Sequence, residues 1–311
     1  MNKDTESIPI IIGTALHVLV ISIIFGICYL VLVIYNYPRL IINYYIPILL
    51  KNTVYLQIIL NFQSFLKMTS EKINPYKEKS NAKTEQVAEM FDNISGKYDF
   101  LNHFFSLGID KIWRRKVRNI VKDIPHKNLL DVATGTGDLA VALSKLKDAQ
   151  ITGVDISNKM LEVGKVKVIK KNLSDRIELK YGDSLNLPFD DAKFDAVTVA
   201  FGVRNFENIG KGLSEISRVL SPGGKIIVLE FSNPTKFPIK QLFNFYSRRL
   251  MPFIGKLVSK DSRAYSYLPE SVQAFPTEDN FAKIIEENGF KNATYKNVSG
   301  GIAAIHVASK K

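Results

Sequence analysis

The stretch that decides the fold is Leu129-Leu130-Asp131-Val132-Ala133-Thr134-Gly135-Thr136-Gly137-Asp138. An apolar run that ends in a glycine-rich turn and then opens an amphipathic segment predicts a strand, a tight loop and a helix. Because Gly135 and Gly137 carry no side chain, the loop backbone can approach a ligand closely. Asp155 ends the next apolar run, where its carboxylate can accept hydrogen bonds from two ribose hydroxyls. The pattern predicts a nucleoside-binding site in a doubly wound α/β fold.

Short apolar runs alternate with amphipathic segments from residue 128 onward. Alternation of this kind is typical of a parallel sheet with both faces covered by helices. The tight connection Ser299-Gly300-Gly301 favours an antiparallel last strand. We therefore predict an α/β fold with a doubly wound, mostly parallel, seven-stranded sheet. The predicted strands lie near 128–133, 150–155, 176–181, 193–201, 224–231, 290–297 and 301–309, with helices near 137–147, 158–171, 208–219 and 277–288.

Helical segments are predicted on both sides of the parallel strands. Apolar residues at helical spacing predict one helix that ends at Gly96 and two more over 98–107 and 110–121, which together form an N-terminal helical lid. Residues 236–274 are predicted as a helical insertion after the fifth strand. Its many aromatic residues could pack as a small core of their own or bind an apolar ligand. Four basic residues of the insertion could meet lipid phosphates: Arg248, Arg249, Lys256 and Lys260.

Residues 1–67 are much more apolar than the rest of the chain. As a helix, residues 8–35 would be about 42 Å long, which is enough to cross a bilayer at a tilt. Two interpretations stay open: the leader is a membrane anchor, or translation begins at Met68 and the leader is a gene-model artefact. The polar residues 68–83 predict a linker, and 84–311 form the folded domain.

Charge and cysteine content limit the choice of partners. The chain has a formal net charge of +12, and its basic residues are spread rather than gathered in blocks. This distribution favours attraction to a membrane surface over a nucleic-acid groove, so we expect no nucleic-acid partner. With Cys28 as the one cysteine, neither a disulfide framework nor a thiolate metal site can form, and we expect no metal.

The glycine-rich loop with its downstream acid fits NAD as well as S-adenosylmethionine. Further features favour S-adenosylmethionine. Asp131 lies on the strand just before the loop, near where a methionine amino group could be held. Asp183 and Ser184 follow the third strand, where an acid can accept a hydrogen bond from the adenine amine, although Asp183 could instead cap a helix. Leu187-Pro188-Phe189-Asp190 then leads into strand four in a way that is common in methyltransferases.

Four stretches carry a more specific pattern: residues 90–99 (MFDNISGKYD), 131–138 (DVATGTGD), 201–205 (FGVRN) and 221–232 (SPGGKIIVLEFS). With them, the chain from about residue 87 to 307 resembles the demethylmenaquinone/ubiquinone-precursor C-methyltransferase family. The resemblance implies a class I methyltransferase domain and S-adenosylmethionine as the donor. Carried onto the matching positions, the cofactor contacts are Thr136, Asp155, Asp183 and Ser184, beside Asp131 and the glycines 135 and 137 of the loop.

Candidate catalytic residues lie on the lid and after strand four. Arg204 and Asn205 follow a glycine turn beside the cofactor crevice and are predicted to hold an oxygen of the acceptor ring; the alternative for Arg204 is a surface ion pair, worth about 0–1 kcal/mol. Tyr98 and Asp99 are predicted to take the proton of a quinol hydroxyl. Two side chains have open roles. These are His103, which could also cap or pack, and Glu230, which faces the site or closes a buried hydrogen bond.

The resemblance implies a specific reaction: methylation of a ring carbon of demethylmenaquinol to give menaquinol, with a polyprenylated quinol as substrate. A ubiquinone precursor is the first alternative. An NAD-dependent oxidoreductase and a non-catalytic scaffold for quinone synthesis are remote ones. We expect the protein at the cytoplasmic face of the membrane, either peripheral or anchored through residues 1–67. The sequence leaves open the tail length, the identity of the base and whether the chain forms a homo-oligomer.

Overall fold

The structure is a computed structural model, and it is described here over residues 73–76, 78–246 and 263–311. The predicted leader 1–67 and the four basic residues between 248 and 260 lie outside this range. Residues 72–311 form one compact unit. Among the described residues, every helix is too short or too polar to cross a bilayer.

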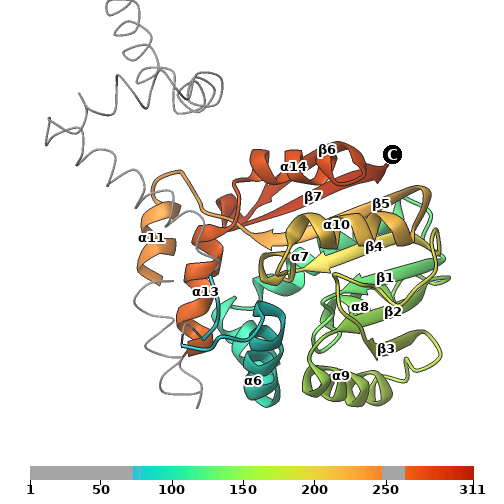
Figure 1. The fold of residues 1–311 in the computed structure, drawn as a ribbon, viewed down its shortest axis with the longest axis horizontal. Helices are drawn as coiled ribbons and strands as arrows, with labels where there is room; N and C mark the ends of the chain where they lie inside the picture. The colour runs from blue at the N-terminus through green and yellow to red at the C-terminus, as the bar shows by residue number, and fades with distance from the viewer. Residues whose placement is uncertain (1–72, 77, 247–262) are drawn as a thin grey trace, which may run out of the picture. The chain divides into compact units, whose positions relative to one another are not determined.

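A single seven-stranded sheet forms the centre of the domain (Figure 1). Its strand order is β3-β2-β1-β4-β5-β7-β6. The first five of these pair in parallel, whereas β7 is antiparallel to both β5 and β6, as predicted. The strands are β1 (Asn128–Val132), β2 (Gln150–Asp155), β3 (Ile177–Tyr181), β4 (Phe194–Ala200), β5 (Leu220–Phe231), β6 (Phe290–Val298) and β7 (Ala303–Lys310).

Helices cover both faces of the sheet because the inner strands are apolar on both sides. On one face, α7 (Ile109–Lys122), α8 (Asp138–Leu143) and α9 (Asn158–Lys170) share a buried core with the strands. On the other face, α10 (Ile209–Val219) and α14 (Glu278–Glu287) do the same. This three-layer arrangement confirms the predicted doubly wound α/β fold.

The helix α6 (Lys83–Phe105) contradicts the predicted break at Gly96. An interior glycine costs a helix about 1 kcal/mol, which packing can offset. Met90 before the glycine and Leu101 after it are both buried in one cluster with Tyr267, so the two halves are held in line. Gly96 itself is exposed. The prediction of two separate helices over this stretch was therefore wrong.

Two elements of the predicted insertion lie among the described residues, α11 (Ile239–Phe245) and α13 (Arg263–Ala274). They lie with α6 beside the end of the sheet at which the parallel strands terminate (Figure 1). Part of the predicted linker packs here as well. Pro75 is buried, and its carbonyl accepts a hydrogen bond from Arg263 Nε at 2.5 Å.

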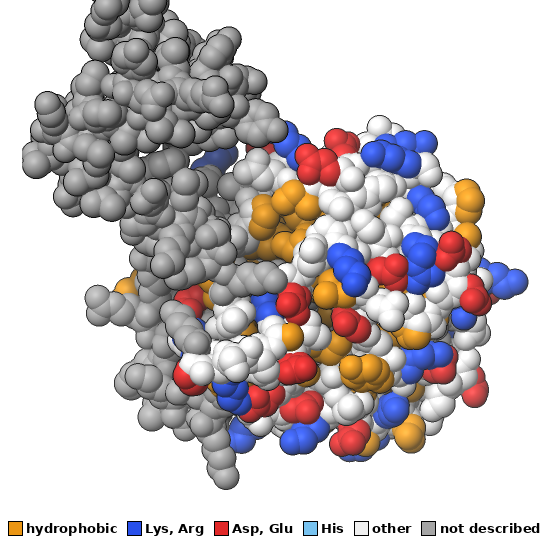
Figure 2. All heavy atoms as spheres, in the orientation of Figure 1, with side chains coloured by type: hydrophobic (Ala, Val, Ile, Leu, Met, Phe, Trp, Pro, Cys, Tyr) orange, Lys and Arg blue, Asp and Glu red, His pale blue; other side chains and the backbone are white. Residues whose placement is uncertain are grey.

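The surface of the domain carries no separation of charge on the face seen in Figure 2. Acidic and basic side chains are interspersed there, as the even spread of both signs along the sequence predicts.

Candidate active site

A narrow crevice of about 60 Å³ lies at the carboxyl ends of the parallel strands. β1 pairs with both β2 and β4, so the strand order reverses at β1. Ligands of doubly wound sheets bind at such a switch point. Of the predicted cofactor residues, the crevice is lined by Gly135, Asp155, Asp183 and Ser184.

Asp155, at the end of β2, is 8 % exposed. Its Oδ2 accepts a hydrogen bond from the Gly135 N–H at 2.8 Å, and its Oδ1 accepts one from the Ser157 N–H at 2.9 Å. Burial raises the pKa of Asp155, and backbone hydrogen bonds from Ser157, Gly135 and Ile156 oppose that rise. A carboxylate has about four lone-pair positions, so the side chain can still accept a hydrogen bond from a ribose hydroxyl.

The backbone around the crevice is strained and close-packed. Ala133 after β1 and Phe201 after β4 have positive φ angles of 54° and 60°, which side chains other than glycine rarely adopt. A Cβ at Gly202 would lie 2.5 Å from the Cβ of Ala133, so the two loops meet where only glycine fits. By contrast, a Cβ at Gly135 would meet nothing within 4 Å, because that residue faces open space. Strain of this kind is concentrated at binding sites.

These features fit an adenosyl cofactor. Asp155 offers acceptors for ribose hydroxyls, and Asp183 lines the same crevice while its Oδ1 accepts the Leu185 N–H at 2.9 Å. The open face of Gly135 leaves room for a ligand close to the loop backbone. The chemistry of the site therefore agrees with S-adenosylmethionine.

Three predicted cofactor residues lie elsewhere. Asp131 is 1 % exposed, and its carboxylate accepts hydrogen bonds from Thr134 Oγ1 at 2.7 Å and Thr198 Oγ1 at 2.8 Å. Burial raises the pKa of Asp131 to about 6. Thr136 Oγ1 donates to Asp99 Oδ1 at 2.5 Å, and Gly137 is the N-cap residue before α8. None of the three lines the crevice, and their cofactor contacts stay a prediction.

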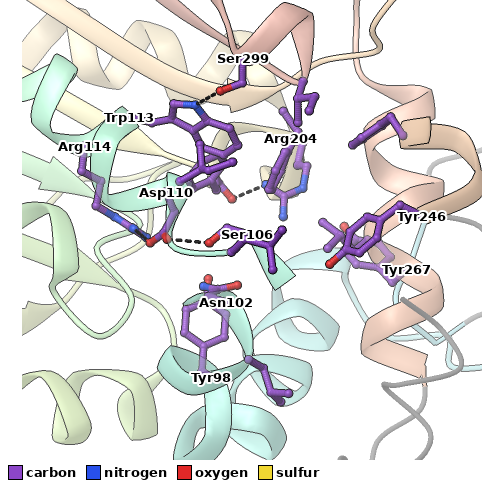
Figure 3. A pocket seen from close by; sticks show the side chains of 18 of the residues that line it. Tyr98, Asn102, Ser106, Asp110, Trp113, Arg114, Arg204, Tyr246, Tyr267 and Ser299 are labelled. Carbon is purple, nitrogen blue, oxygen red and sulfur yellow. Dashed lines mark hydrogen bonds and ion pairs between the residues drawn. The ribbon is translucent and has the colours of Figure 1, made fainter. Parts of the chain in front are cut away.

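A larger cavity of about 400 Å³ adjoins the crevice and is mainly apolar (Figure 3). Its walls come from α6, α7, α11, α13 and the ends of β4 and β5. Three residues line both spaces, namely Phe91, Tyr98 and Phe201. A ligand in the cavity would therefore meet a ligand in the crevice at these side chains.

Arg204 lines the cavity and is held by a buried carboxylate. Its Nη1 donates to Glu230 Oε1 at 2.7 Å and to the Phe201 carbonyl at 2.5 Å. Glu230 is 1 % exposed and lines neither space, so it closes a buried ion pair, and the surface-pair alternative for Arg204 is wrong. Within the described part of the chain, Nε of Arg204 is buried without a partner and Nη2 donates no hydrogen bond.

Asn205 lines the crevice rather than the cavity, and its Oδ1 accepts a hydrogen bond from the Tyr267 hydroxyl at 3.2 Å. Tyr267 lines the cavity, so this bond joins the two spaces. Arg204 and Asn205, which were predicted to hold one acceptor oxygen together, therefore line two different neighbouring spaces.

Of the two predicted proton acceptors, only Tyr98 lines the site. Burial raises the pKa of Tyr98, so at neutral pH its phenol is protonated and acts as a hydrogen-bond donor. Asp99 accepts from Thr136 and forms an ion pair with Lys167 at 2.7 Å. Asp99 lines neither space, and its two partners favour a structural role.

His103 belongs to an ionic network next to the cavity. Its Nδ1 lies 2.9 Å from Asp110 Oδ2, and its Nε2 lies 3.6 Å from Asp138 Oδ2. The ligand atoms of these three residues lie within 4.8 Å of one another, a spacing that could hold a metal ion. However, Arg114 and Lys167 pair with the same carboxylates and already supply positive charge.

The sequence analysis missed a polar stripe on α6. Tyr98, Asn102 and Ser106 follow at four-residue spacing and all line the cavity. Residues four apart lie on one face of a helix, so the predicted helix over 98–107 already placed these three side chains together, but only Tyr98 was assigned to the site. Trp113 and Arg114 of α7 were missed as well.

A doubly wound sheet with an acid at the end of β2 and a glycine-rich loop after β1 defines a nucleoside-binding α/β domain. A solved structure described as a putative S-adenosyl-L-methionine-dependent methyltransferase from Methanococcus maripaludis has the same fold, with a TM-score of 0.50 and 23 % identity. The match covers 76 % of this chain and 97 % of that one.

Residues 79–310 match the ubiE/COQ5 methyltransferase family, and the chain belongs to that family. A demethylmenaquinone methyltransferase of Bacteroides fragilis is 47 % identical over 241 residues, which cover 77 % of this chain and 98 % of the relative. A ubiquinone/menaquinone biosynthesis C-methyltransferase of Geotalea daltonii is 43 % identical over 234 residues, covering 75 % and 99 %. The protein is thus an S-adenosylmethionine-dependent methyltransferase, and the expected oxidoreductase alternative is not supported.

Proposed function

We propose that this enzyme methylates a ring carbon of a polyprenylated demethylmenaquinol to give menaquinol. The observation that carries the proposal is the apolar cavity of about 400 Å³ with the buried, partly unpaired guanidinium of Arg204 in its wall. A quinol ring with an isoprenoid tail needs apolar walls and a donor for its oxygen. A ubiquinone precursor has the same needs and is the second candidate, since the relatives bear both names.

The donor cofactor would be held in the crevice, with Asp155 on its ribose and Asp183 near its base. When bound there, S-adenosylmethionine supplies a methyl group on a sulfonium, which is already a good leaving group. The protein then has to align an electron-rich carbon and keep it dry. The side chains shared by both spaces are therefore the ones that bring the acceptor carbon to the donor.

Arg204 would bind the ring oxygen next to the reacting carbon. Its charge lowers the pKa of that hydroxyl, so the proton is released to solvent as the quinol binds, and the oxyanion pushes electron density onto the adjacent carbon. After methyl transfer this carbon loses its own proton to water, which restores the aromatic ring. Tyr98, protonated and buried, donates a second hydrogen bond to the same oxygen. Both donors are fixed before the reaction, Arg204 by Glu230 and Tyr98 by its hydrogen bond with Asn102.

The helices α6, α7, α11 and α13 would act as a lid that excludes water from the acceptor. All four contribute side chains to the cavity, and α6 and α13 contact each other. Without water, the charge of Arg204 acts in a medium of low dielectric constant and is more effective. The predicted lid and insertion would then have one function, the enclosure of the ring.

The mouth of the cavity would face a membrane. Leu107 and Leu242 line the cavity and yet are 82 % and 65 % exposed, so they mark its opening. Other exposed apolar side chains flank them on the same helices and loops, namely Phe104, Phe237 and Phe245. The exposed charges of the ranges 100–116 and 233–246 are all basic, which suits anionic headgroups. We infer peripheral association through this opening.

The test of the function is methyl transfer by the full chain with labelled S-adenosylmethionine and chemically reduced demethylmenaquinone in lipid. Label in the quinone supports the proposal. Label only in a ubiquinone precursor would assign the second candidate, and cofactor binding without turnover of either would indicate a scaffold. Arg204→Gln should lose at least about a hundredfold in kcat/KM, the scale of one lost oxyanion donor, whereas Arg115→Gln on the exposed side of α7 should not.

A further inference from the structure

Arg114 is a second buried arginine in the wall of the cavity. Its side chain is 9 % exposed and its Nη1 donates to Asp110 Oδ2. Nη2 lies 3.8 Å from Asp138 Oδ2, and Nε is buried with no hydrogen-bond partner among the described residues. A buried donor without a partner lowers stability, so an acceptor oxygen beside this guanidinium would be bound favourably.

Asp110 places an acceptor next to that donor. It is 3 % exposed and lines the cavity. Its Oδ2 meets Arg114 and His103, whereas its Oδ1 accepts a single hydrogen bond, from Ser106 Oγ at 2.6 Å. A carboxylate oxygen can accept two hydrogen bonds, so Oδ1 has one position left. The pair thus offers a donor and an acceptor from one wall (Figure 3).

The two arginines of the cavity are separated by an aromatic pair. Cζ of Arg114 lies 5.9 Å from the centre of the Phe201 ring, and Cζ of Arg204 lies 5.5 Å from the centre of the Phe231 ring. The two rings are in contact, with centroids 4.5 Å apart. Each guanidinium is therefore fixed at a different place in the same cavity, as a ring with two oxygens on opposite sides requires.

We propose that Arg114 and Asp110 form a second oxygen subsite, which binds the ring hydroxyl opposite to the one held by Arg204. This inference rests on the proposed quinol substrate. The hydroxyl oxygen accepts from the Arg114 guanidinium, and its O–H donates to Asp110 Oδ1. A quinone carbonyl has no proton to donate and would be repelled by the carboxylate. The subsite therefore selects the reduced ring, which is the form that can react.

The experiment compares two acceptors with the full-length enzyme in lipid: 2-prenyl-1,4-naphthalenediol and 3-prenyl-1-naphthol. The second lacks only the hydroxyl assigned to Arg114 and keeps the one next to the reacting carbon. We expect the parent enzyme to prefer the diol by at least about tenfold in kcat/KM, the scale of one hydrogen bond to a charged group. In Arg114→Gln the ratio of the two kcat/KM values should fall to near unity. Arg204→Gln should instead lower kcat/KM for both substrates by the same factor.

Asp138→Asn is the matched control. Asp138 contacts Arg114 but does not line the cavity, so this variant weakens the same ionic network without changing the cavity wall. The preference for the diol should therefore be unchanged. Arg114→Lys keeps the positive charge near Asp110 while removing the fork of N–H donors, and serves if the glutamine variant fails to fold. A diol preference that persists in Arg114→Gln or Arg114→Lys would overturn the subsite. If the parent methylates neither compound, the proposed substrate fails instead.

Discussion

Replacing Asp131 by asparagine should change how the stability of the domain depends on pH. The carboxylate is 1 % exposed, yet both of its oxygens accept hydrogen bonds from threonine hydroxyls, Thr134 Oγ1 at 2.7 Å and Thr198 Oγ1 at 2.8 Å. Burial outweighs these bonds and raises the pKa of Asp131 from 3.8 to about 6. The folded protein therefore binds this proton more tightly than the unfolded chain does.

The sign of the effect follows from this difference. Stability from the bound proton is complete below pH 3.8 and is lost as the pH rises through about 6. The full loss is about 3 kcal/mol, at about 1.4 kcal/mol for each pKa unit. Roughly half of that loss, about 1.4 kcal/mol, falls between pH 5 and pH 8. Asparagine does not titrate, so Asp131→Asn should gain this amount relative to the parent over that range.

Urea unfolding of the parent and of Asp131→Asn at pH 5, 6, 7 and 8 measures the gain directly. The exposed Asp175→Asn is the control, for which the difference from the parent should stay constant. Asparagine loses one of the two acceptor oxygens, which lowers stability by a similar amount at every pH and leaves the slope unchanged. A difference that is flat across the four pH values, or that grows against the variant, would refute the assignment of a buried, proton-binding Asp131.

Three further changes test the crevice and the cavity. Asp155→Ala should weaken S-adenosylmethionine binding more than tenfold in calorimetry, about 1.4 kcal/mol, because the ribose loses its acceptors; unchanged affinity would contradict that role. Arg204→Met should lower the free energy of unfolding by about 3–5 kcal/mol, because Glu230 stays buried without its partner, and Arg204→Met/Glu230→Met should recover part of that loss. If the losses of the two single variants add up in the double variant in thermal unfolding, the two residues are not a coupled pair. Gly202→Ala should cost about 1–3 kcal/mol, because its Cβ would lie 2.5 Å from the Cβ of Ala133. In the same melts Gly96→Ala should raise the stability by up to about 1 kcal/mol, because the position is inside α6 with open space around it.

The strands and the glycine-rich loop could be predicted because their signals are local. Four residues of β1, 129–132, and four of β4, 196–199, are buried throughout, as strands of a parallel sheet covered on both faces are. Gly135 and Gly137 do adopt positive φ angles. The helix break at Gly96 failed for the opposite reason. Packing on either side of the residue, which local propensity does not contain, decided the outcome.

The roles of individual carboxylates could not be read from the sequence, because their partners are distant along the chain. Asp131 is joined to Thr198, which is 67 residues away, and Asp99 to Thr136, which is 37 residues away. Both acids lie close to motif residues in sequence and were therefore assigned to the ligand. The sheet register brings Thr198 opposite Asp131, and α6 brings Asp99 onto the loop. Such pairings are set by topology and not by spacing.

The two arginine–carboxylate pairs of the cavity show why this acceptor site is built from buried ions. A buried pair adds little to stability compared with apolar side chains of the same volume. Arg204 with Glu230 and Arg114 with Asp110 nevertheless occupy an otherwise apolar cavity. Each carboxylate fixes one edge of its guanidinium, and N–H groups at the other edge have no partner within the described residues. A lone arginine would turn toward solvent or backbone carbonyls. The paired arginine stays in place and keeps donors for the ring oxygen, so stability is given up for orientation.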